Sequence, residues 1–243
     1  MDVIKGLKTV EEINGTIFHF IFNNRRNLGM AFIRFQEHYD SPEFKNKCFT
    51  LDEFKAWYMK EKKSETFTYY TDWAGYNFPD TALTAFQEER FADLTDAENA
   101  ILRWLNQVKG RFYVIGSVGR DDETFRHEMA HAFYYLEPEY REKAESIVKS
   151  YNTTPIKMWL EYRGYDDDVM IDEIQAYMSC NPSLILKPHA KEYYKTLIAE
   201  TTELFENECR KISRRFSTLR TQLGVDTSPG MKCNLRGQPC LSI

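Results

Sequence analysis

The sequence predicts an α+β fold that is mostly helical, with a small sheet placed before one well-defined helix. Apolar residues recur at helical spacing over most of the chain, and Thr50 and Thr95 each open a capping box with a glutamate three residues later. Strand-like runs are few and short, and the clearest is the run RFYVIGSV at 111–118. With 243 residues, the chain can bury a substantial apolar core without disulfides.

The N-terminal half alternates short strand and helix patterns. The expected elements are a strand at 16–22, helices at 28–38 and 50–60, a β-prone segment at 67–70, and helices at about 80–90 and 95–108. The turn-rich stretch 72–79 is expected to be a loop. Its aromatic residues Trp73, Tyr76 and Phe78 are expected in the core rather than in a cleft.

The C-terminal half begins with the strand at 111–118, which Gly119 ends. The helix that follows carries Phe125 to Leu136 and stops before Pro138. Further helices are expected at about 139–151, 155–163, 168–179 and 188–219. The chain then divides into an N-terminal region of unknown role (1–110), a catalytic region (111–220) and an irregular tail (221–243), or forms one continuous domain.

Charge and cysteine content restrict the partners and the compartment. The net charge of −5 does not favour nucleic-acid binding by the whole surface. A basic C-terminal segment is the exception and could contact an anionic partner, although a solvated face explains such a run as well; it comprises Arg210, Lys211, Arg214, Arg215, Arg220, Lys232 and Arg236. Five scattered cysteines without a CxxC pair predict free thiols and a cytoplasmic protein. The N-terminus lacks a signal-peptide pattern, and no apolar run is long enough to cross a bilayer.

The chemistry of the sequence is concentrated in residues 127–131, which read His-Glu-Met-Ala-His. Positions i and i+4 of an α-helix share one face, so His127 and His131 can direct ring nitrogens at one tetrahedral zinc ion. Glu128 lies about 100° around the helix from His127. It is therefore beside the metal, where it can accept a proton from the attacking water as the general base.

A catalytic zinc ion usually has three protein ligands and one open position. Glu173 is the favoured third ligand, because it lies on a later helix with Ala176 on the same face, where a small residue permits close approach. Alternatives remain open, namely Asp166, Asp167, Asp168, Asp172, Cys180, His19, His38 and His189. Helix capping explains most of these aspartates equally well.

With these motifs the chain resembles the zincin metallopeptidases, and among them the gluzincins. The resemblance covers residues 111–180 and rests on His127, Glu128 and His131, followed by Glu173 and Ala176. It implies a zincin-like domain with a strand just before the active-site helix, and an edge strand that lines the cleft and pairs with extended substrate. The metzincin subclass is excluded, because its third histidine would fall at Glu137.

The resemblance implies a zinc-dependent peptidase acting on a protein or peptide, and the family often supplies a tyrosine, histidine or arginine to stabilise the oxyanion. Tyr177 is the favoured candidate, with Tyr162, Tyr165 and His189 as alternatives. Asp172 is a candidate to orient a histidine ligand. Alternative functions are a metal-dependent hydrolase of a non-peptide amide and a metal-binding regulatory module without turnover. A deformylase-like site is disfavoured, because Cys48 is the sole upstream cysteine and lacks flanking glycines.

Overall fold

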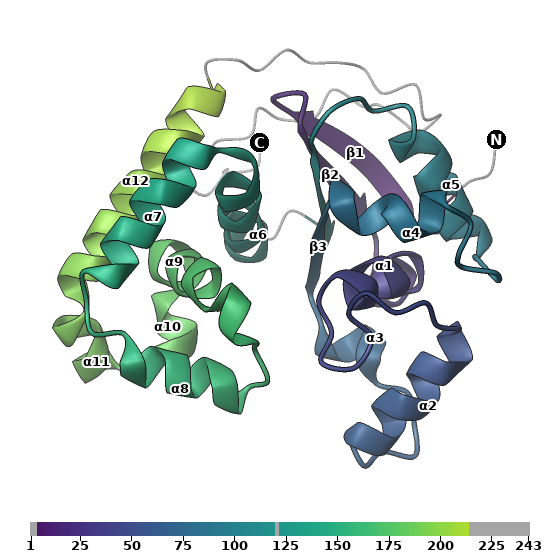
Figure 1. Cartoon of the computed structure of the whole chain (residues 1–243), viewed down its shortest axis with the longest axis horizontal. Helices are drawn as coiled ribbons and strands as arrows, with labels where there is room; N and C mark the ends of the chain where they lie inside the picture. The colour runs from purple at the N-terminus through teal and green to yellow at the C-terminus, as the bar shows by residue number, and fades with distance from the viewer. Residues whose placement is uncertain (1–3, 120–121, 214–243) are drawn as a thin grey trace, which may run out of the picture.

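The computed structural model describes residues 4–119 and 122–213, and it confirms a mostly helical α+β fold (Figure 1). The strands are β1 (Leu7–Ile13), β2 (Ile17–Phe22), β3 (Gly75–Pro79) and β4 (Tyr113–Val118). The helices before β4 are α1 (Arg25–Tyr39), α2 (Leu51–Glu61), α3 (Tyr69–Asp72), η1 (Asp80–Leu83), α4 (Thr84–Gln87) and α5 (Asp96–Leu105). Those after it are α6 (Asp122–Leu136), α7 (Pro138–Lys149), α8 (Thr154–Tyr162), η2 (Asp167–Val169), α9 (Met170–Cys180), α10 (Pro182–Ile185), α11 (Pro188–Tyr193) and α12 (Lys195–Ser213).

The four strands form one mixed sheet in the order β1-β2-β4-β3. β1 and β2 form an antiparallel hairpin, and its turn residues Asn14 and Gly15 have φ of 56° and 74°, as a tight hairpin turn requires. β4 runs parallel to β2, and β3 closes the sheet as an antiparallel edge strand. β3 and its neighbour β4 both contact α6 in the C-terminal half.

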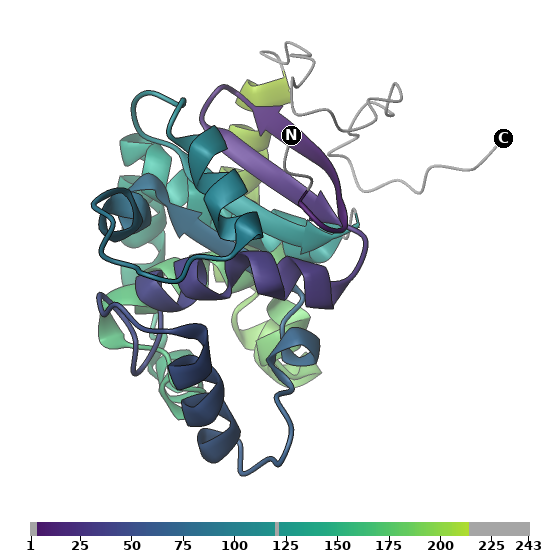
Figure 2. The ribbon, with the colours of Figure 1, turned by 90° about the vertical axis from the view of Figure 1, so that its right-hand side faces the viewer.

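Helices cover both faces of the sheet (Figures 1 and 2), and each face packs in a separate apolar cluster. Phe20, Val114 and Phe78 belong to the larger cluster, which α1 and α5 complete. On the opposite face, Ile17 and Ile115 pack with residues of α6. Behind α6, helix α9 packs against α7 and α12. The sheet thus supports α6 from one side while α9 supports it from the other.

Several expectations for single elements were wrong. β1 was missed, because its strand face includes acidic residues instead of a clean apolar alternation. The β-prone segment at 67–70 enters the short helix α3, and the expected loop at 72–79 contains β3. The expected helix at 80–90 consists of the short pieces η1 and α4, and the one at 188–219 is divided into α11 and α12 at Tyr194. As expected, Tyr76 and Phe78 are buried, whereas Trp73 is 46% exposed.

The capping boxes at Thr50 and Thr95 are both formed. None of the helices in the described ranges is long and apolar enough to cross a membrane. The residues of the basic C-terminal segment beyond position 213 lie outside the described residues, as does the predicted tail. The sheet combines strands from both sides of residue 110, and the domain boundary there stays a prediction.

Candidate metal centre

Helix α6 presents the His-Glu-Met-Ala-His motif on its inner side. Met129 and Ala130 are buried in the cluster that packs α6 against the sheet, and they fix the rotation of the helix. This rotation directs His127 and His131 toward α9, and their Nε2 atoms lie 3.2 Å apart. The helical repeat alone produces this pairing.

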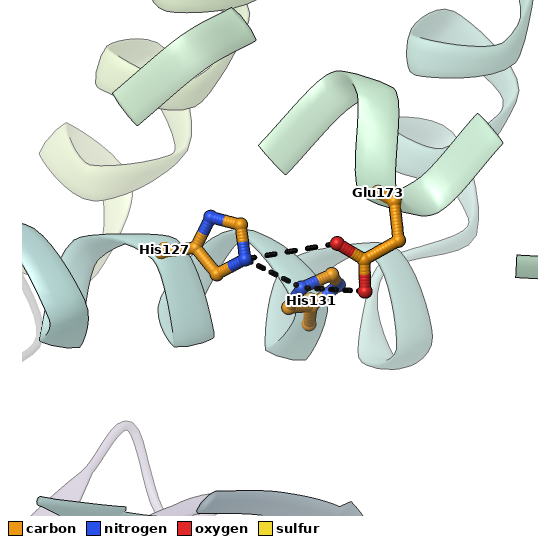
Figure 3. Close-up of side chains that lie close together, drawn as sticks. All are labelled: His127, His131 and Glu173. Atoms are coloured by element: carbon orange, nitrogen blue, oxygen red, sulfur yellow. Dashed lines mark hydrogen bonds and ion pairs between the residues drawn. The ribbon is translucent and has the colours of Figure 1, made fainter. Parts of the chain in front are cut away.

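Glu173 reaches the same point from α9 (Figure 3). Its Oε2 lies 3.8 Å from His127 Nε2, and its Oε1 lies 3.7 Å from His131 Nε2. Ala176, one turn further along α9, is fully buried in the cluster that contains Met129 and Ala130. A small side chain at this position allows the two helices to approach closely.

The donor set fits a divalent ion such as zinc. Tetrahedral zinc with Zn–N bonds of 2.0–2.1 Å places two ligand nitrogens about 3.3 Å apart, close to the separation of the two Nε2 atoms. Oε2 of Glu173 is buried and has no hydrogen-bond partner among the described residues. A buried polar atom without a partner is costly, and coordination to a metal would satisfy it. Within the described ranges, His127, His131 and Glu173 are the residues whose ligand atoms cluster in this way.

Electrostatics reflect the crowding of the three groups. Burial, with a smaller contribution from His131, lowers the pKa of His127 well below its usual value. Burial raises the pKa of Glu173 to about 8. Burial also lowers the pKa of His131, but the carboxylates of Asp172 and Glu173 outweigh it and raise that pKa to about 10. Binding of a cation to this cluster would therefore compete with protons.

A second carboxylate orients His131. Oδ1 of Asp172 lies 2.9 Å from His131 Nδ1, so the other ring nitrogen faces the ligand cluster. Gln175 Nε2 donates to the same Oδ1 at 2.9 Å, and the Tyr140 hydroxyl donates to Gln175 Oε1 at 2.7 Å. Asp172 thus occupies the position of an outer-shell carboxylate, the role suggested for it by the sequence.

Glu128 lies against the edge strand. The Nδ2 group of Asn77 on β3 donates to Glu128 Oε2, and the hydroxyl of Tyr113 donates to Asn77 Oδ1 at 2.6 Å. A Cβ atom on Gly75 would lie only 2.8 Å from Glu128 Oε1, so the absence of a side chain there makes room for the carboxylate. Burial raises the pKa of Glu128, while His131 and the Asn77 hydrogen bond oppose that rise. The strand and the helix together hold the carboxylate in place.

Asn77, Gly75 and Tyr113 were not found from the sequence. The alternation of Tyr76 and Phe78 was the one available signal for a strand there, and the neighbouring glycine, asparagine and proline obscured it. Without the strand assignment, nothing connected Asn77 to a motif 51 residues away.

Tyr177 lies beside the cluster. Its ring centroid is 4.6 Å from that of His127, and its hydroxyl is 3.2 Å from the hydroxyl of Tyr165. Burial raises the pKa of both phenols, so both stay protonated and can donate hydrogen bonds. Tyr162 and His189 are exposed, and Tyr162 is 88% exposed.

The other candidate ligands lie elsewhere. The Cys180 thiol donates to the carbonyl of Arg126. His19 Nε2 is 2.7 Å from Ser117 Oγ, and His38 Nδ1 is 2.8 Å from the Lys47 carbonyl. Asp166, Asp167 and Asp168 are exposed, and Lys45 pairs with Asp168 at 2.9 Å. The exposed Cys48 is not part of the cluster either.

A cavity of about 270 Å³ lies next to Asp172, between the C-terminal end of α1 and helices α6, α7 and α9. Tyrosines and charged groups line it, namely Tyr39, Asp40, Lys45, Tyr113, Tyr134, Tyr135, Arg141, Asp168 and Asp172, together with Val169. Comparison of the chain with protein-family models, curated proteins and solved structures found no match.

Proposed function

We propose that this protein is a zinc-dependent metallohydrolase, and that it is a peptidase which cleaves peptide bonds with an activated water. The observation that carries the proposal is the convergence of His127 Nε2, His131 Nε2 and the Glu173 carboxylate. Glu128, held by Asn77, lies close enough to His131 and Glu173 to influence the pKa of both groups. Free cysteines at Cys48, Cys180 and Cys209 are compatible with a cytoplasmic location, which is part of the proposal.

The residues of the chain have separate roles in the proposed reaction. A zinc ion bound by His127, His131 and Glu173 would supply Lewis acidity at the carbonyl and lower the pKa of a coordinated water. Glu128 accepts a proton from the attacking water and passes it to the leaving amine. Asn77 keeps the Glu128 carboxylate oriented during both transfers.

The anchored position of Glu128 favours a catalyst over a module that only binds metal. Burying a carboxylate is costly, and a purely structural role would not explain why Glu128 is buried beside three candidate metal ligands. The Tyr177 ring contacts that of His127, and its hydroxyl lies beside that of Tyr165, so these protonated phenols can donate to a developing oxyanion. Tyr177 is the candidate for this role, because its ring contacts a ligand residue directly.

The test is Glu128→Gln in zinc-loaded protein, assayed on quenched-fluorescence peptide pools. The variant is expected to retain stoichiometric zinc, because Glu128 is not a ligand, and to lose about 10²–10⁴-fold in kcat. Glu43→Gln, the same change at an exposed carboxylate away from the cluster and the cavity, is the matched control and should behave as wild type. Equal turnover by Glu128→Gln and wild type would contradict the mechanism, and a wild-type protein that holds zinc without cleaving any pool would favour the regulatory module.

A further inference from the structure

The outer edge of β3 offers very few free hydrogen-bonding groups. The Tyr113 amide donates to the Thr16 carbonyl at 2.8 Å, so alternate residues of β4 bond to β2 and the remaining ones bond to β3. In the observed register, Gly116 and Val114 therefore bond to Tyr76 and Phe78. The residues of β3 with outward backbone groups are consequently Gly75, Asn77 and Pro79.

Two of these three positions have no free amide proton to donate to an incoming strand. The backbone N–H of Asn77 donates to Gln36 Oε1 at 2.7 Å, so a side chain from α1 takes the place of a neighbouring strand. Pro79 has no amide proton. Gly75 alone keeps both an outward N–H and an outward C=O without a partner among the described residues. Blocking an edge in this way prevents further strand pairing.

The remaining free position lies at the proposed reaction centre. Gly75 is the residue whose missing Cβ leaves room for Glu128 Oε1. Past Asn77, the strand ends opposite Tyr113, which lines the 270 Å³ cavity together with Tyr39 and Asp40 of the α1 end. A substrate that passes Gln36 therefore meets a pocket instead of a continuous strand edge.

We propose that substrates pair with β3 through Gly75 alone, because Gln36 occupies the next docking position. The site then selects short peptides, or peptides cut close to one end, whose end enters the cavity. Gln36 is the specificity-determining residue in this account, since it sets how far a substrate can extend along the edge. The inference rests on the proposed peptidase function.

The experiment measures binding and not turnover, so its failure can be told apart from failure of the peptidase proposal. Peptide hydroxamates bind zinc without being cleaved. Alternating Ala-Leu peptides of two and six residues, carrying the hydroxamate at either end, are titrated by calorimetry into zinc-loaded full-length protein. For wild type, lengthening the peptide is expected to change Kd less than twofold in both series.

Gln36→Ala should free the backbone N–H of Asn77 for pairing with a substrate. The six-residue compound is then expected to bind about two- to tenfold more tightly than to wild type in at least one series, the value of one added hydrogen bond. The two-residue compounds should keep their Kd. Gln36→Glu retains an acceptor on the same stem and should resemble wild type. Zinc content and circular dichroism confirm that each variant is folded.

Three results would overturn the inference. The first is a wild-type Kd that falls tenfold or more as the peptide lengthens. The second is the same dependence of Kd on length in wild type and Gln36→Ala, and the third is that zinc-loaded protein binds no hydroxamate. A protein that shows the expected length dependence but cleaves no peptide pool would contradict the peptidase proposal and support the docking geometry.

Discussion

His131 Nδ1 lies 2.9 Å from Asp172 Oδ1, and this contact fixes which ring nitrogen faces the candidate metal centre. Asp172→Asn should therefore weaken zinc affinity about 10–100-fold, because the neutral amide orients the ring less firmly and makes it less basic. Competition with a chromophoric chelator measures the affinity. Gln175→Glu keeps the size of the neighbouring residue but replaces its donor, so it should weaken zinc binding less than Asp172→Asn does. An unchanged zinc affinity in Asp172→Asn would show that the contact has no part in ligand orientation.

Glu173→Ala tests the third ligand. Removal of the carboxylate leaves two histidines, so the variant should lose stoichiometric zinc after dialysis, as determined by elemental analysis. Asp166→Asn and Asp168→Asn serve as controls in the same acidic region, because both carboxylates are exposed and pair with Lys45. If Asp166→Asn or Asp168→Asn lost zinc while Glu173→Ala retained it, that aspartate and not Glu173 would be the third ligand.

Gly75→Ala tests the seat of the general base. The added Cβ would lie 2.7 Å from Thr124 Cγ2 and 2.8 Å from Glu128 Oε1, so the carboxylate must move. A displacement of about 1 Å can cost on the order of 10²-fold in rate, and a fall of this size in kcat is expected with zinc content unchanged. Trp73→Ala, at an exposed position just before β3, should leave kcat unaffected. Wild-type kcat in Gly75→Ala would mean that Glu128 does not depend on this contact.

Glu37 predicts how stability depends on pH. Burial raises the pKa of Glu37 to about 7, although a hydrogen bond from Tyr69 opposes the rise. The unfolded chain releases the Glu37 proton near pH 4.5, whereas the folded chain keeps it until about pH 7. The stability that the protonated Glu37 side chain contributes is therefore lost as pH rises from about 4.5 to about 7. Glu37→Gln cannot ionise and should avoid this loss.

Chemical unfolding of the two proteins measures the effect. The unfolding free energy of Glu37→Gln minus that of wild type should increase by about 2–3 kcal/mol between pH 5 and pH 8, since each pKa unit corresponds to 1.36 kcal/mol. Glu43→Gln, at an exposed carboxylate, should give a flat difference. A flat difference for Glu37→Gln as well would show that the carboxyl is already ionised when folded.

Local rules were sufficient for most of the longer helices and for the candidate metal ligands. Thr50 and Thr95 form their capping boxes with residues three positions away, and the helical repeat alone brings His127 and His131 to one face. Glu173 could be suggested because Ala176 on its face permits close approach of a second helix. In each case the partners are one turn apart or belong to one periodic pattern.

The rest of the site depends on contacts between distant segments. Sequence patterns alone assigned 72–79 to a loop, and only pairing with β4 makes Gly75–Pro79 an edge strand. That pairing brings Asn77 to Glu128 and to Gln36, across 51 and 41 residues of sequence. The sequence determined that His127 and His131 could bind one metal ion, because their spacing on one face is set within a single helical turn. The tertiary structure decided what orients Glu128 and how much strand edge stays free, because backbone pairing energy depends on neighbours that no local pattern specifies.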